Sequence, residues 1–183
     1  MDTVHPSNEP PKDFAMLTQV IQHAPTWVWA LLAGLIAVGV SQTFPRSMTI
    51  RRATIVPVAM VGLWFFGVIS IFGAQAVATE AWALGLAAAV ALSVAVGAWR
   101  GIVWSAQDRR LQVPGSWGPL MLILGIFTTR FGVGATVTMH PAMIVDPLFG
   151  LMVGLAYGGF SGLFLSRGVA MWKVVHKALT ARS

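Results

Sequence analysis

The sequence predicts an all-α, polytopic transmembrane bundle of five spans, with the N-terminus outside and the C-terminus in the cytoplasm. Of the 183 residues, 56% are hydrophobic and only 10% are charged, whereas soluble domains carry roughly 25% charged residues. A soluble domain of this size could not bury so many apolar side chains. In addition, several apolar runs reach the roughly 17–25 residues that a membrane-spanning helix needs.

The chain begins with a polar, proline-bearing segment at residues 1–22. It lacks the basic start and short apolar core of a signal peptide, so we expect an exposed tail. Its end, FAMLTQVIQHAP, places Phe14, Leu17 and Ile21 at near-helical spacing. This pattern is compatible with an interfacial helix that lies on the membrane before the first span.

The apolar runs place a transmembrane domain at residues 23–173, followed by a basic cytoplasmic tail at 174–183. Pro25 precedes the first span, and Pro119 lies in the first turn of the fourth, where proline is well tolerated. The expected spans are residues 26–43, 53–73, 80–99, 117–138 and 148–172.

The distribution of basic residues predicts the orientation. With five spans, ten of the 12 lysines and arginines fall on the same side of the membrane, which the positive-inside rule assigns to the cytoplasm. These ten are Arg46, Arg51, Arg52, Arg100, Arg109, Arg110, Arg167, Lys173, Lys177 and Arg182. Most tryptophans fall near span ends, as an aromatic belt requires, and only Trp64 lies in mid-span.

Several function classes are disfavoured. The net charge of +6 flanks apolar segments, so we expect the lipid bilayer, and no nucleic acid, as its partner. The chain has no cysteine, which excludes disulfides and thiolate metal sites. It contains no G-x-S-x-G, H-E-x-x-H or phosphate-binding glycine motif, so we expect neither an enzyme nor a cofactor.

Glycine recurs every four residues in the fifth span, at Gly150, Gly154, Gly158 and Gly162. This spacing forms a smooth face that another helix backbone can approach closely. We expect this face to pack inside the bundle. A homo-oligomer or membrane-protein partner contact through the same face is the alternative.

Arg130 is the one charged residue of the apolar stretch from Trp117 to Met139. It lies about 12 Å from the outer end of its span, so we expect it to face protein or a wet cavity. The expected companions are Tyr157 of the next span, with Thr129 and Ser161. Arg130 is then either a structural pin bonded to carbonyls and hydroxyls, or the counter-charge of an anionic substrate, lipid headgroup or cofactor carboxylate.

Two further hypotheses stay open at this point. In the first, the protein is a transporter or permease component and Arg130 faces an anionic substrate. In the second, it is an accessory factor for haem or electron transfer that uses His23 and His140, which both fall at the outer surface. No metal site is expected, since neither histidine has a second ligand at helical spacing.

The stretches MLTQVIQHAPTWVWALLAGL, VPGSWGPLMLILGIFTTRFGVG and YGGFSGLFLSR together resemble a family of small bacterial inner-membrane proteins catalogued as a domain of unknown function. The resemblance covers about residues 16–172 and implies a five-helix inner-membrane protein without an assigned activity. A fainter similarity, in size, span count and intramembrane arginine, is to membrane proteins found beside cytochrome c biogenesis genes. We therefore expect a non-enzymatic inner-membrane protein whose fourth and fifth helices pack through glycine around Arg130.

Overall fold

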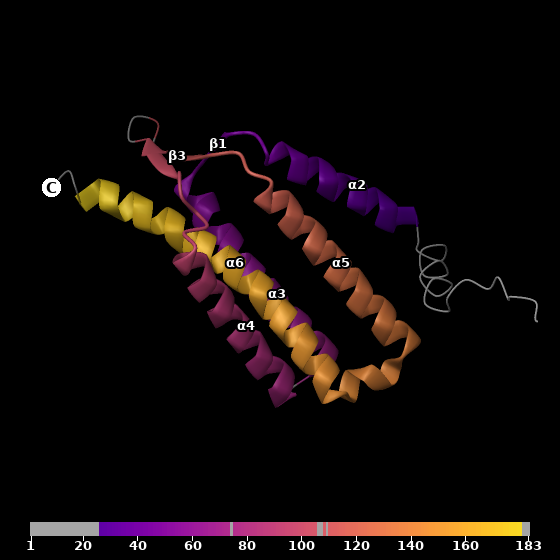
Figure 1. Cartoon of the computed structure of the whole chain (residues 1–183). Coiled ribbons are helices and arrows are strands. Elements are labelled where there is room, and N and C mark those ends of the chain that lie inside the picture. The colour runs from indigo at the N-terminus through magenta and orange to yellow at the C-terminus, as the bar shows by residue number, and fades with distance from the viewer. Residues whose placement is uncertain (1–25, 74, 106–107, 109, 181–183) are drawn as a thin grey trace, which may run out of the picture.

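The computed structural model describes residues 26–73, 75–105, 108 and 110–180 (Figure 1). Its long helices are α2 (Thr26–Ser41), α3 (Ile50–Phe72), α4 (Ala76–Ala95), α5 (Gly118–Met139) and α6 (Pro147–Thr180), and a short 3₁₀ helix, η1 (Pro141–Val145), joins the last two. Helices α3 to α6 are long and apolar enough to cross a membrane, and α2 is a shorter apolar helix. The predicted fold class, a helical bundle of the multi-pass membrane type, is thereby confirmed. The expected N-terminal tail and interfacial helix lie outside the described residues.

Several helix boundaries differ from the prediction, and α3 and α4 begin three and four residues earlier than expected, at Ile50 and Ala76. Helix α4 ends at Ala95 rather than at Trp99, because Gly97 adopts a positive φ of 61° and the Ala98 amide turns back to the Ser93 carbonyl. Helix α6 does not end at the expected start of a basic tail but continues to Thr180. Its 34 residues extend about 50 Å, which exceeds the roughly 30 Å hydrocarbon core of a bilayer.

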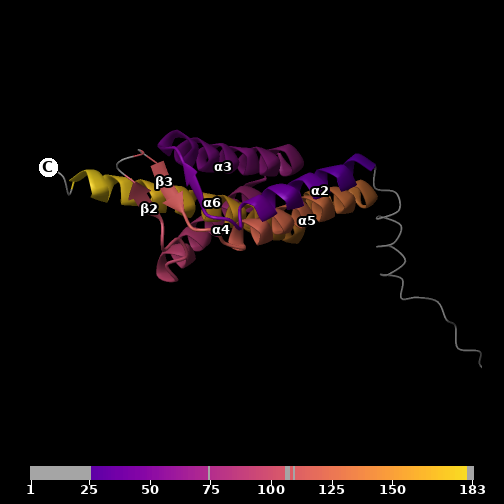
Figure 2. The ribbon, with the colours of Figure 1, turned by 90° about the horizontal axis from the view of Figure 1, so that it is seen from above.

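The helices form two groups. Helix α6 packs along α4 and α3, and these three form the main bundle, whereas α2 lies beside α5 (Figures 1 and 2). Gly39 near the end of α2 lies against Leu120 at the start of α5, so these two helices are antiparallel. Helix α5 contacts α6 much less than α4 does. The Arg130 side chain therefore lies where the two groups meet.

The glycine face of α6 packs against α4, which corrects the expectation that it would pack against the preceding helix. A Cβ atom at Gly154 would lie 2.9 Å from the Ala81 Cβ, and one at Gly162 would lie 2.8 Å from the Ala89 Cβ. At Gly158 it would collide with the Trp82 carbonyl. The face is thus covered by a helix of the same chain, and a partner would have to displace α4 to use it.

A small antiparallel sheet, which the sequence analysis did not anticipate, closes one end of the bundle. Strands β1 (Arg46–Met48) and β2 (Val103–Ser105) both pair with the central β3 (Arg110–Val113). Leu111 and Val113 point inward from β3, because successive side chains of a strand alternate between faces. The sheet brings the connection after α2 and the connection after α4 to the same end of the molecule, here called the sheet end.

The bundle has two apolar cores. One lies around Trp64, Val68 and Tyr157 in the middle of α3 and α6. The other joins the sheet to the far part of α6, and its buried members are Ala53, Ile102, Leu111, Val113, Met171 and Val175. Because Val175 is part of this core, the last turns of α6 belong to the fold and do not form a separate tail.

Candidate functional site around Arg130

Arg130 reaches from α5 over two aromatic rings of the main bundle. Its Cζ atom lies 5.2 Å from the centroid of the Trp64 ring of α3 and 5.8 Å from that of Tyr157 of α6. Both distances lie within the range of a cation–π interaction. The structure thus brings Arg130 and Tyr157 together, and it is the ring of Tyr157 that the guanidinium faces.

The two rings form a rigid support, called here the aromatic platform (Trp64 and Tyr157). Trp64 is 2% exposed and Tyr157 is 1% exposed. They meet edge to face, with their centroids 4.7 Å apart, and Phe160 lies beside Trp64 at 5.4 Å. This T-shaped geometry is favourable for aromatic pairs. The faces that Arg130 contacts therefore have fixed positions.

Gly67 of α3 makes room for the guanidinium. A Cβ atom at this position would lie 2.9 Å from Nη2 of Arg130 and 3.2 Å from Cε2 of Tyr157. Both contacts are closer than non-bonded carbon contacts normally are. A glycine one turn of helix beyond Trp64 is thus what allows α3 to accept the arginine side chain.

Arg130 has no hydrogen-bond acceptor within the described part of the chain. No carboxylate, carbonyl or hydroxyl of these residues pairs with it, and its side chain is exposed. A guanidinium carries five N–H donors, and a structural pin would direct them at carbonyls and hydroxyls. The aromatic platform supports the cation but leaves its donors available.

The other expected companions do not contribute to this site. The Thr129 hydroxyl donates to the Gly125 carbonyl of its own helix at 2.8 Å. The Ser161 hydroxyl is buried, donates to the Tyr157 carbonyl at 2.9 Å and accepts from Nε1 of Trp82 on α4 at 3.2 Å. Ser161 therefore joins α6 to α4 and does not reach Arg130.

Of the two histidines considered for haem, only His140 lies in the described residues, and His23 precedes them. His140 follows the last residue of α5, and its side chain is exposed. Within the described residues no three histidine, cysteine, aspartate or glutamate side chains gather as metal ligands would. The haem hypothesis gains no geometric support from these residues.

Trp64 and Gly67 are the site residues that sequence reasoning missed. A signal for Trp64 was present, because it is the one tryptophan outside the aromatic belt. A mid-span tryptophan brings a large ring into the same apolar layer as Arg130, where the two can form a cation–π pair. Gly67 carried no such signal, since isolated glycines are frequent in transmembrane helices.

Fold and site together define a multi-pass helical membrane protein with an arginine held on an aromatic platform within its apolar layer. The chain belongs to a family of unknown function, DUF6622, which it matches over residues 9–181. The expected membership of an uncharacterised family is thereby confirmed. No curated protein and no solved structure gives a significant match, and the similarity to cytochrome c biogenesis proteins is not among these findings.

Proposed function

We propose that this protein is a non-enzymatic component of the bacterial inner membrane that binds an anionic ligand at Arg130. The observation that carries the proposal is the free set of guanidinium donors on the aromatic platform. A ligand carboxylate or phosphate would accept hydrogen bonds from the N–H groups at the outer edge of the guanidinium. The rings of Trp64 and Tyr157 would stay in contact with the face of the guanidinium.

The magnitudes favour a binding site over a pin. Placing an arginine at the centre of a bilayer costs about 2.5–3.5 kcal/mol or more. Two cation–π contacts offset this by on the order of 1–2 kcal/mol each. They do not satisfy the N–H groups, and unpaired polar groups in an apolar layer carry a further cost. An anion that pairs with these groups would remove that remaining cost.

The depth of Arg130 limits the ligand class. Arg130 lies nine residues before the end of α5 at Met139, a distance of about 14 Å along the helix axis. An anion at this depth arrives either through a water-filled path or as the charged end of a molecule dissolved in the bilayer. We favour an anionic amphiphile. The transporter hypothesis requires the water-filled path instead.

The proposed topology has five spans, an outside N-terminus and a cytoplasmic sheet end. The pairing of β1 with β3 supports it, because this pairing places the connections after α2 and α4 at one end. That end also carries Arg46, Arg100 and Arg110, as the positive-inside rule requires of a cytoplasmic face. Helix α2 would be the fifth span; its 16 described residues extend about 24 Å.

Native mass spectrometry of gently extracted protein, combined with thermal unfolding, tests the proposal. We expect wild type and Arg51→Gln, a control arginine at the sheet end, to retain the same anionic species. Arg130→Gln should lose that species while its Tm is unchanged or higher, since glutamine costs less to place in an apolar layer than arginine does. A Tm drop in Arg130→Gln with no bound species in any form would instead identify a structural pin.

A further inference from the structure

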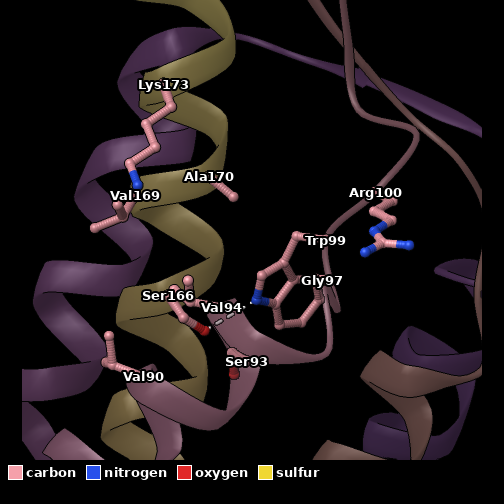
Figure 3. Close-up of a pocket in the computed structure, with 10 residues that line it drawn as sticks. All are labelled: Val90, Ser93, Val94, Gly97, Trp99, Arg100, Ser166, Val169, Ala170 and Lys173. Carbon is pink, nitrogen blue, oxygen red and sulfur yellow. Dashed lines mark hydrogen bonds between the residues drawn. The ribbon is translucent and has the colours of Figure 1, made fainter.

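A second polar site lies at the sheet end, away from Arg130. A cavity of about 170 Å³ opens between the end of α4 and α6 (Figure 3). This is about ten times the ~10–15 Å³ that one water molecule requires. The distance from Tyr157 to Lys173, which lines the cavity, is about 24 Å along α6. The cavity and the Arg130 site are therefore separate.

Ser93 of α4 provides an unpaired hydroxyl in this cavity. The residue is 4% exposed, and its Oγ atom has no hydrogen-bond partner. Ser166, on the other helix, is already satisfied: it accepts from Nε1 of Trp99 at 2.9 Å and donates to the Leu163 carbonyl at 2.9 Å. A buried hydroxyl without a partner costs free energy, and a ligand in the cavity would supply the missing hydrogen bond.

Two cations, Arg100 and Lys173, line the same cavity, and no acidic residue does. In Figure 3 the Lys173 side chain runs along α6 toward Val169, and Arg100 lies beyond the Trp99 ring. The Arg100 guanidinium folds over Gly97, where a Cβ atom would lie 2.7 Å from its Cζ. Arg100 is also close to the negative end of the α4 dipole, so Lys173 is the cation with less compensation from the protein.

The surroundings add to the positive charge. Arg167 lies over the Trp99 ring at 5.4 Å. At the start of β1, burial and then the neighbouring Arg52 lower the pKa of Arg46. The sheet end, which carries the cavity, thus has an excess of basic over acidic side chains, and this excess favours the binding of an anion there.

We propose that this cavity binds the phosphate group of an anionic phospholipid, with Ser93, Lys173 and Arg100 as its polar contacts. Phosphate accepts several charge-assisted hydrogen bonds at once, which suits one hydroxyl and two cations. Val90, Val94 and Val169 also line the cavity, and such apolar side chains fit an acyl chain better than water. Basic pockets between transmembrane helices at the cytoplasmic face are known to bind lipid headgroups.

The test is lipid binding by the delipidated full chain, measured by native mass spectrometry with defined probes. The probes are phosphatidylglycerol, zwitterionic phosphatidylcholine, and inorganic phosphate as a competitor. Ser93→Ala removes one buried, unpaired oxygen and should leave the fold intact. The matched control is Lys177→Gln, one helical turn beyond Lys173 and outside the cavity lining.

We expect phosphatidylglycerol to bind in preference to phosphatidylcholine. Lys173→Gln and Arg100→Gln should each weaken its binding about fivefold, and Ser93→Ala about tenfold. All variants are compared in an Arg130→Gln background, so that the Arg130 site contributes no lipid binding, and Lys177→Gln should leave the remaining binding unchanged. Displacement by millimolar inorganic phosphate would make free phosphate the ligand of the same groups, and resistance to it would identify the lipid. Equal binding of both lipids, or equal weakening by Lys177→Gln, would overturn the proposal.

Discussion

Arg130 and Ser93 are two polar side chains that lack hydrogen-bond partners among the described residues, and they lie at two different depths of the molecule. Each is a polar group on a mostly apolar helix, and neither has a hydrogen-bond partner in the described part of the chain. Arg130 retains its charge on a platform of two rings, and Ser93 faces a cavity lined by two cations. An ionisable residue within a transmembrane segment is by default a candidate functional site, and a buried polar group without a partner requires an explanation.

Gly67→Ala tests whether the position of Arg130 matters. The added methyl group would meet Nη2 of Arg130 at 2.9 Å, so we expect the guanidinium to move off the aromatic platform. Retention of the anionic species should fall about tenfold, the equivalent of roughly 1.4 kcal/mol, which is the size of one cation–π contact. Native mass spectrometry measures the retained fraction.

Gly62→Ala is the matched control for that substitution. It lies on the same helix, and a Cβ atom there would meet nothing within 4 Å. It should bind as wild type does. Equal retention in Gly67→Ala and Gly62→Ala would show that the ligand does not depend on how Arg130 is placed.

At the scale of elements, α4 and α6 are the two helices that pack most closely in the bundle. Glycines of α6 pack against alanines of α4. In the opposite direction, Gly85 of α4 packs against the Leu155 carbonyl of α6. Close approach of this kind lets two apolar helices gain dispersion energy without a hydrophobic driving force between them. Each glycine face therefore needs small residues on both helices.

Gly158→Ala should disrupt this contact, because the new methyl group would collide with the backbone of Trp82. We expect a loss of about 1–3 kcal/mol in the free energy of unfolding. The next residue offers the control, since a Cβ atom at Gly159 would meet nothing within 4 Å. The free energy of unfolding in detergent is measured for Gly158→Ala and Gly159→Ala. An equal loss in the two variants would contradict the packing of α6 against α4.

The sequence predicted the glycine face, but the partner expected for it, the preceding helix, was wrong. Periodicity shows which residues share a face, whereas the partner depends on a matching face elsewhere. The sequence does contain that match, because Ala81, Gly85 and Ala89 recur every four residues along the alanine-rich third span. The sheet is different. Its strands have three or four residues, too few for a period to appear, and β1 pairs with a strand about sixty residues away in the chain.

Leu111→Ala tests whether the sheet is part of the fold. Leu111 is fully buried in the core between the sheet and α6, so we expect a loss of about 2–5 kcal/mol. Gln112→Ala, the exposed neighbour on the same strand, should cost less than 0.5 kcal/mol, as surface substitutions do. Comparable stability of the two variants in denaturant titrations would mean that the sheet does not stabilise the bundle.

At the scale of the whole molecule, the number of spans and the orientation depend on α2. The sequence predicted the four longer apolar helices from hydropathy alone, with boundary shifts of one to four residues except at the end of α6, which extends to Thr180. It also predicted which helices carry Arg130 and Tyr157. It could not predict how the two helix groups pack against each other. Apolar helices of similar composition carry no pattern of charge or side-chain size in the sequence that identifies their neighbours.

Cysteine labelling tests this topology cleanly, because the natural chain contains no cysteine. A membrane-impermeant maleimide added to intact cells should label Thr26→Cys before α2 and Ala142→Cys in η1. Ser47→Cys in β1 should react only after lysis. If Thr26→Cys also required lysis, α2 would not cross the membrane and the protein would have four spans.

The most direct measurement of the central claim is the ¹⁵N–¹H spectrum of the arginine side chains in the delipidated protein. The chain has nine arginines, and the Nε–Hε signal of Arg130 is the one that Arg130→Lys removes. We predict that oleate, a membrane-soluble carboxylate, shifts this signal in proportion to occupancy and that oleyl alcohol, its uncharged analogue, does not. An Arg130 signal that stays in place with oleate, in protein that is folded, would contradict an anion-binding role and leave Arg130 as a structural residue.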